Sequence, residues 1–161
     1  MSVKVKKSFL NGALSWYFSK AGCVRLMDDV SLCMEIERDK RCYAFELLFK
    51  KGYENDGLNV PKFLQKWFKK IDKKNELYNF AGFAFCFLYD VKGCLQKDFI
   101  LSLPECDSIF KGILLNAGVS RFKASVISFV LSGFCGYFDR WVSPSSVKNV
   151  VCSKVICIDG R

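Results

Sequence analysis

The sequence predicts an α+β domain over residues 1–133, in which antiparallel hairpins pack on helices, and a short C-terminal extension over residues 134–161 that carries one strand. Two patterns predict this class. Apolar and polar residues alternate across residues 24–37, which is typical of a strand with one buried face. Elsewhere, apolar residues recur every three or four positions, which is typical of helices. With 161 residues, 51% of them hydrophobic, the chain can bury one sizeable core.

The first predicted elements are a helix and a hairpin. The helix covers residues 7–20 and ends at Gly22, because glycine commonly terminates helices. Its inward residues are expected to be Phe9, Leu10, Ala13, Leu14, Tyr17 and Phe18. A strand follows at once, and residues 30–51 form a hairpin that turns at residues 38–40. The buried face of these strands is expected to consist of Val24, Leu26, Val30, Leu32, Met34 and Ile36.

The second predicted helix covers residues 60–74, with Asn59 as its N-cap and Pro61 in its first turn. Its inward stripe is expected to be Val60, Phe63, Leu64, Trp67, Phe68 and Ile71. Its exposed face is rich in lysine and carries Lys62, Lys66, Lys69, Lys70, Lys73 and Lys74. The only acidic residue on this helix is Asp72, so the lysine face is strongly positive.

The rest of the chain repeats the hairpin-plus-helix unit. Residues 77–103 form a second hairpin, whose first strand, NFAGFAFCFLY, is apolar on both faces and turns at residues 90–93. A third helix begins near Pro104 and ends near Gly118, and Ser120 caps a fourth helix. The inward stripe of the fourth helix is expected to be Phe122, Val126, Phe129 and Val130. Residues 147–158 form the last strand, so the expected order is αββαββα(α) followed by a strand.

The charge balance favours an anionic partner. Lys and Arg number 25 against 16 Asp and Glu, which gives a net charge of +9. A nucleic acid, a membrane surface or an acidic protein would fit this charge, and we favour a nucleic acid. The candidate phosphate-binding residues are the lysines of the second helix and Lys4, Lys6 and Lys7 near the N-terminus. The alternative interpretation is that these lysines only form solvated faces.

Composition also excludes several kinds of chemistry. The chain has no histidine, which excludes Ser-His-Asp and Cys-His catalysis and histidine metal ligands. Its nine cysteines form no CxxC pair, so we expect no zinc site, no other metal and no cofactor. We interpret the cysteines as reduced thiols, mostly buried, in an intracellular protein. The longest apolar runs, residues 80–89 and 125–138, are too short or too interrupted to predict a membrane span.

The predicted order of elements, in a basic chain of this length, resembles a single-motif LAGLIDADG homing endonuclease or maturase. The matching run is residues 14–24, in which Leu14, Gly22 and Cys23 fit the family motif and Tyr17 and Phe18 stand at apolar positions. Further on, FLQKWFKKID, FILSL and SRFKASVISFVL are similar to later elements of the family.

This chain departs from the motif where the family places its metal-binding acids. Ser19 and Ala21 stand at the acidic positions, and neither side chain can hold the Mg²⁺ that cleaves DNA. Trp16 replaces a motif glycine that lets two such helices pack closely. The resemblance therefore implies a non-catalytic RNA-binding or structural protein. It also implies a mitochondrial setting, in a ribonucleoprotein such as an organellar ribosome or in an intron-splicing factor.

Two alternatives stay open. The first is an active homodimeric Mg²⁺-dependent DNA endonuclease in which Asp28 or Asp29 replaces the lost acid. The second is a basic protein-binding module without a nucleic-acid role. Besides RNA, we expect protein neighbours on the first helix and on the second hairpin, because a sheet that is apolar on both faces needs a cover.

Overall fold

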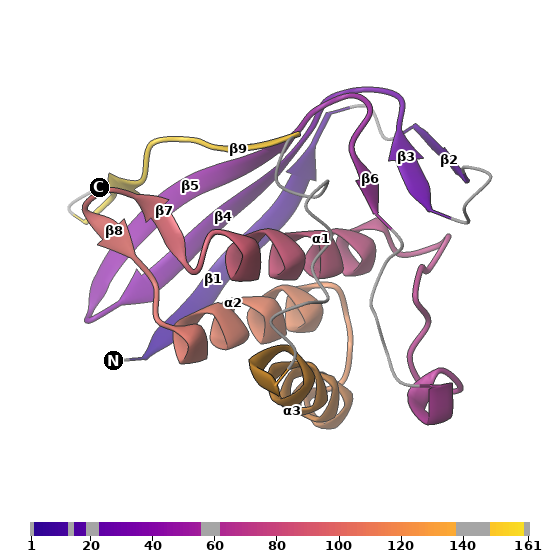
Figure 1. Cartoon of the computed structure of the whole chain (residues 1–161). Coiled ribbons are helices and arrows are strands. Elements are labelled where there is room, and N and C mark those ends of the chain that lie inside the picture. The colour runs from indigo at the N-terminus through magenta and orange to yellow at the C-terminus, as the bar shows by residue number, and fades with distance from the viewer. Residues whose placement is uncertain (1, 13–14, 19–22, 56–61, 138–148, 160–161) are drawn as a thin grey trace.

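The computed structural model describes residues 2–12, 15–18, 23–55, 62–137 and 149–159. Figure 1 shows an antiparallel sheet with helices packed along one of its faces, which confirms the predicted α+β class. The order of elements differs from the prediction, however, because the chain begins with strands and its first long helix comes only after residue 75.

The main sheet contains five strands, which all pair antiparallel. In order across the sheet they are β1 (Val3–Asn11), β4 (Val30–Arg38), β5 (Arg41–Phe49), and then β9 (Val150–Cys152) and β10 (Ile156–Cys157), which share the far edge of β5. The two last strands come from the predicted C-terminal extension, where one continuous strand was expected. Residues 150–157 of the extension therefore form an edge of the main sheet.

The hairpin of β4 and β5 confirms the first predicted hairpin. Its two turn residues, Asp39 and Lys40, have φ values of 51° and 64°, as the tightest hairpin turns require. The predicted buried face is also confirmed, since each of its residues is at most 2% exposed: Val24, Leu26, Val30, Leu32, Met34 and Ile36.

The predicted helix over residues 7–20 is wrong. Residues 3–11 form β1, which pairs with β4 along its whole length, and Trp16–Phe18 form the short strand β2. A bulge between Val5 and Lys7 shifts the register, which disguises the two-residue period of this strand in the sequence. Pairing with a distant strand outweighs the local helical spacing of the apolar residues. The resemblance to the LAGLIDADG family loses the helix on which it depended, and residues 14 and 19–22 of the motif lie outside the described residues.

A second, smaller sheet joins β2 to β3 (Val24–Leu26) and β6 (Glu54–Asn55). It is tied to the helical layer because the indole N–H of Trp16 donates to both carboxylate oxygens of Glu76, each at 3.1 Å. Trp16, which stands at a glycine position of the family motif, therefore lies in a strand and joins the small sheet to Glu76.

The strand predicted to begin the second hairpin is also wrong, because this stretch forms helix α1 (Glu76–Asp90). A segment that is apolar all round fits a buried helix as well as a buried strand, and its length of 15 residues favours the helix. The predicted turn after it is present, with Lys92 and Gly93 at positive φ. Only β7 (Cys94–Gln96) and β8 (Phe99–Ile100) remain of the predicted hairpin, so the expected apolar docking sheet does not exist.

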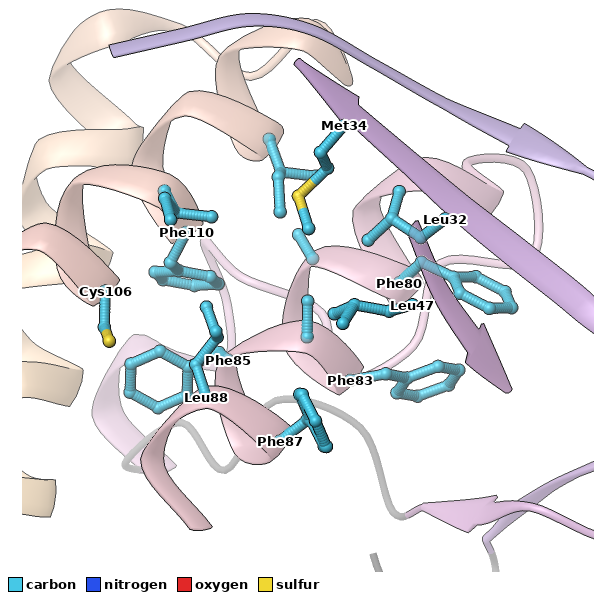
Figure 2. Packing of buried hydrophobic residues seen from close by; sticks show 14 of the residues in the cluster. Leu32, Met34, Leu47, Phe80, Phe83, Phe85, Phe87, Leu88, Cys106 and Phe110 are labelled. Carbon is cyan, nitrogen blue, oxygen red and sulfur yellow. The ribbon is translucent and has the colours of Figure 1, made fainter. Parts of the chain in front are cut away.

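The core lies between the main sheet and two helices. Figure 2 shows Phe80, Phe83 and Phe85 of α1 and Phe110 of α2 (Leu103–Asn116) packed against Leu32, Met34 and Leu47 of the sheet. The Phe49 and Phe80 rings meet edge to face at 5.1 Å, and the Phe85 and Phe110 rings lie 4.7 Å apart. The third predicted helix is confirmed by α2, which approaches β1 closely at Gly112.

A buried ion pair fixes the start of α2. Ser102 and Glu105 form a capping box, in which the Ser102 backbone N–H donates to the Glu105 carboxylate at 2.7 Å. Arg38, at the end of β4, donates to the same carboxylate at 2.8 Å, and Glu105 is only 1% exposed. This pair joins the main hairpin to the helical layer.

The fourth predicted helix is confirmed by α3 (Arg121–Tyr137), and Ser120 accepts a hydrogen bond from the Lys123 N–H at 3.3 Å. Its predicted inward stripe is confirmed only in part, because Val126 and Val130 are half-buried and pack against the core but the two phenylalanines are exposed. Phe122 and Phe129 are 73% and 81% exposed. The face of α3 that packs toward α2 consists instead of Ala124, Ile127, Ser128 and Leu131. In the described part of the chain, no helix is long and apolar enough to cross a membrane.

Candidate nucleic-acid interface

Residues 62–74, here called the basic-aromatic segment, form a protruding stretch at the lower right of Figure 1. The predicted helix is wrong here. The chain makes one 3₁₀ turn, η1 (Lys62–Leu64), followed by turns and bends, and residues 56–61 lie outside the described residues. Lysines spaced four apart repel one another on a helix, which disfavours helical structure in this segment. Every lysine that was predicted for its exposed face is exposed: Lys62, Lys66, Lys69, Lys70, Lys73 and Lys74.

Two aromatic side chains stand among these lysines. Phe63 is 74% exposed and Trp67 is 63% exposed. Their neighbours Leu64 and Phe68 are 8% and 3% exposed and anchor the segment in the core. The N–H groups of Trp67 and Phe68 both donate to the Leu64 carbonyl at 2.9 Å. This tight turn directs one pair of apolar side chains inward and presents the other pair to solvent.

Hydrogen bonds from α1 hold the second half of the segment in place. The Tyr78 hydroxyl donates to the Lys69 carbonyl at 2.6 Å. The Asn79 side chain accepts from the Asp72 N–H at 2.7 Å and donates to the Asp72 carbonyl at 2.8 Å. Burial, with a smaller contribution from the Asp72 carboxylate, raises the pKa of Tyr78 well above its usual value, so the hydroxyl stays protonated and can donate. The backbone under the lysines is therefore fixed, and their side chains project from it.

The N-terminal lysines are in a different environment. Lys4, Lys6 and Lys7 are exposed residues of β1, at the opposite side of the molecule in Figure 1 from the basic-aromatic segment. Lys6 forms an ion pair with Glu37 at 2.5 Å, and this contact lowers the pKa of Glu37. Lys7 lies 5.0 Å from the centre of the Phe9 ring and faces Glu35 across the sheet. The structure does not join the two predicted lysine groups into one surface, and the acids beside β1 weaken its attraction for an anion.

The two acids considered as replacements for the lost metal ligand, Asp28 and Asp29, instead accept hydrogen bonds from other residues of the chain. Asp28 accepts a hydrogen bond from the Ser15 hydroxyl, and Asp29 accepts from the Lys51 N–H at 2.7 Å. Among the residues that the structure describes, no three cysteine or acidic side chains gather into a group that could hold a metal ion. Ser19 and Ala21 lie outside the described residues.

Two of the described cysteines are held in the unreactive thiol form by burial. Burial raises the pKa of Cys106 to about 12 and that of Cys152 to about 11, so both thiols are protonated at neutral pH. The expectation that most cysteines are buried needs correction. Cys106 is buried, whereas Cys94 and Cys157 are exposed and the remaining described cysteines are half-buried.

No protein-family model, curated protein or solved structure matches this chain.

Sequence reasoning found the lysines of this site and missed its aromatic residues. Phe63 and Trp67 were assigned to the inward stripe because they share its helical spacing. A signal was present, since Lys62, Lys66 and Lys69 are interleaved with the aromatic residues, as in many surfaces that bind single-stranded nucleic acids.

Proposed function

We propose that this chain is a non-catalytic RNA-binding protein whose basic-aromatic segment holds single-stranded RNA. The observation that carries the proposal is the exposure of Phe63 and Trp67 among the exposed lysines of one anchored segment. Aromatic rings stack on unpaired bases, and lysines neutralise the phosphates between them. Because α1 fixes the backbone of the segment, little of it must be ordered on binding.

The aromatic residues favour a single strand over a duplex. In a duplex the bases already stack on one another, so their faces are not accessible to Phe63 and Trp67. Lysines alone would bind both forms, with a strong dependence on salt. A preference for unpaired RNA is thus the part of the proposal that depends on the two rings.

The proposal can be tested by fluorescence anisotropy with a labelled oligouridine, measured at several salt concentrations. We expect the affinity to fall with salt at a log–log slope of about −3, as about four phosphate contacts on a single strand would produce. Phe63→Ala and Trp67→Ala should each weaken binding about tenfold, since stacking contributes ~1–3 kcal/mol per base.

A matched pair of charge variants separates a local effect from a general one. Lys66→Gln with Lys70→Gln should reduce the salt slope by about 1.4, at 0.7 per phosphate. Lys4→Gln with Lys7→Gln removes the same charge from β1 and should leave the slope nearly unchanged. Equal effects of the two double variants would contradict a site in the basic-aromatic segment.

The alternatives predict different outcomes of simple assays. Binding to vesicles that contain phosphatidylserine, without RNA binding, would assign the segment to an anionic membrane surface. Nicking of plasmid DNA with Mg²⁺ that is lost in Asp29→Ala would support the endonuclease. Binding that ignores both salt and nuclease treatment would support a protein-binding module.

The wider setting of the proposal is a mitochondrial ribonucleoprotein, which the sequence resemblance implied and which the basic-aromatic segment neither requires nor depends on. Sedimentation of native extract with and without RNase tests this setting separately. Comigration with a large particle that is lost on RNase treatment would support it, and a small species indifferent to RNase would contradict it.

A further inference from the structure

Helix α3 has two apolar faces on opposite sides. One face packs toward α2 and includes Ala124, Ile127 and Leu131, which are at most 3% exposed. The other, here called the outer stripe, consists of the exposed Phe122, Phe129 and Gly133 and of Val126, which is half-buried and also packs against the core. At 100° per residue, these four positions fall within an arc of about 60° directly opposite the buried face. The α3 helix forms the outermost layer of the fold in Figure 1.

The outer stripe is too apolar to be an ordinary solvated surface. Phe122 is 73% exposed and Phe129 is 81% exposed, and they lie two helical turns apart with Val126 between them. Large exposed aromatic residues on one helix face commonly mark an interaction site. The flanks of the stripe at its N-terminal end carry Arg121 and Lys123, both exposed.

Along the outer stripe, large and small side chains lie at equal distances on either side of the midpoint, so an antiparallel copy would place them opposite each other. If a second α3 helix lies antiparallel, each Phe122 faces the Gly133 of the other copy, and each Val126 faces the other Phe129. Among the described residues, a Cβ atom added at Gly133 would meet nothing within 4 Å, so this position leaves open space for a ring. Large residues thus meet small ones throughout, as an isologous two-fold interface requires.

The charges favour the same antiparallel direction. The first turn of α3 has no acid and its last turn has no base, so Arg121 and Lys123 at the N-terminal end are not balanced within the helix. In an antiparallel pair these cations lie beside the C-terminal end of the partner helix, whose carbonyl groups carry partial negative charge. In a parallel pair, the cations of both copies would meet.

We propose that two copies of this chain associate through an antiparallel pair of α3 helices that buries the outer stripe. Two exposed phenylalanine side chains present on the order of 300 Å² per copy. This is less than the roughly 800 Å² per partner of a standard stable interface, so the dimer is weak and reversible. It forms at micromolar concentrations and does not involve the basic-aromatic segment.

Sedimentation velocity at protein concentrations from about 5 to 300 µM tests the dimer. We expect a monomer–dimer equilibrium with a Kd of tens of micromolar. Phe122→Ser with Phe129→Ser should raise the Kd at least tenfold. Phe63→Ser is the matched control, because this phenylalanine is equally exposed on another surface, and it should leave the Kd unchanged.

Two further variants test the register and exclude unfolding as the cause. Gly133→Lys should stabilise the α3 helix against heat and yet abolish association, because its side chain fills this open space and adds a cation near Arg121 of the second copy. Ser132→Glu places a carboxylate on the flank that carries Arg121 of the antiparallel partner, and should tighten the dimer about fivefold at low salt. Ser132→Gln is its uncharged control.

Several results would overturn the proposal. The chain could remain monomeric at 300 µM, or it could form a dimer that the outer-stripe variants leave intact. Binding to lipid vesicles that Phe122→Ser with Phe129→Ser abolishes, in a monomeric chain, would assign the stripe to a membrane instead. Tighter association in Ser132→Gln than in Ser132→Glu would contradict the antiparallel register.

Discussion

Gly112→Ala tests the closest approach between the sheet and the helices. Gly112 lies in the middle of α2, and a Cβ atom added there would sit 2.5 Å from Cγ2 and 2.6 Å from Cβ of Val5 in β1. Ordinary contacts between carbon atoms are about 3.5–4.0 Å, so α2 and β1 would have to separate by about 1 Å. The Val5 Cβ atom is attached to the backbone, so no change of rotamer can relieve this contact.

The magnitude follows from two opposing effects. Replacing glycine with alanine inside a helix favours folding by about 1 kcal/mol. Overpacking of a well-packed site costs about 1–3 kcal/mol, and a contact this short with a backbone-fixed atom belongs at the upper end. We expect Gly112→Ala to lower the free energy of unfolding by about 2 kcal/mol, which corresponds to a decrease in Tm of roughly 4–8 °C for a chain of this size.

Gly133→Ala is the matched control, because it makes the same chemical change in the neighbouring helix, where no described residue lies within 4 Å of the new atom. It should raise the free energy of unfolding by up to about 1 kcal/mol. Urea denaturation of both variants at low protein concentration gives the comparison. If Gly112→Ala were as stable as Gly133→Ala, the close packing of α2 on β1 would be refuted.

Two other contacts give predictions of the same kind. Arg38→Ala leaves the Glu105 carboxylate buried without its cation and should cost about 3 kcal/mol of unfolding free energy in thermal or urea denaturation. Burial raises the pKa of Glu105, but the hydrogen bonds from Ser102 and the charge of Arg38 outweigh it and lower the pKa below 4.5. The stabilisation of the fold by the ionised Glu105 carboxylate is therefore complete above about pH 4.5 and is lost as the pH falls below that value. Glu105→Gln should remove this dependence and flatten the plot of unfolding free energy against pH in that range. Tyr78→Phe removes the hydrogen bond to Lys69 and should lower the free energy of unfolding by about 1 kcal/mol. Trypsin should then cut the basic-aromatic segment faster than in the parent chain. Unchanged cleavage would show that this bond does not hold the segment.

Sequence patterns predicted the parts of the fold that depend on local signals. The sequence of the β4–β5 hairpin has a strict two-residue period and a tight turn at Asp39 and Lys40, and the structure confirms both predictions. Helix α2 has proline in its first turn and a Ser102–Glu105 capping box, which mark its start unambiguously.

The failures came where the signal was ambiguous or not local. The stretch that forms α1 is apolar all round, so its sequence period cannot separate a helix from a strand. Strand β1 was misassigned because its bulge between Val5 and Lys7 breaks the two-residue period and because its partner, β4, is distant in sequence. In the basic-aromatic segment, repulsion among closely spaced lysines disfavours the predicted helix. The prediction missed this effect because it considered only the spacing of the apolar residues.

The wrong predictions of burial are informative about function. Phe63, Trp67, Phe122 and Phe129 were all assigned to inward stripes, and all four are 63% or more exposed. Each lies in an element that is already anchored by other apolar residues, Leu64 and Phe68 in one case and the inner face of α3 in the other. Their rings are therefore not needed to attach these elements to the core. Places where sequence and fold disagree in this way tend to be functional. The charges beside the two aromatic pairs distinguish the RNA-binding role proposed for Phe63 and Trp67 from the dimer contact proposed for the phenylalanines of α3. The many lysines of the basic-aromatic segment match the charge of a polyanion. The outer stripe of α3 is neutral and has two cations at its N-terminal end, which match the partial negative charge at the C-terminal end of a second, antiparallel helix.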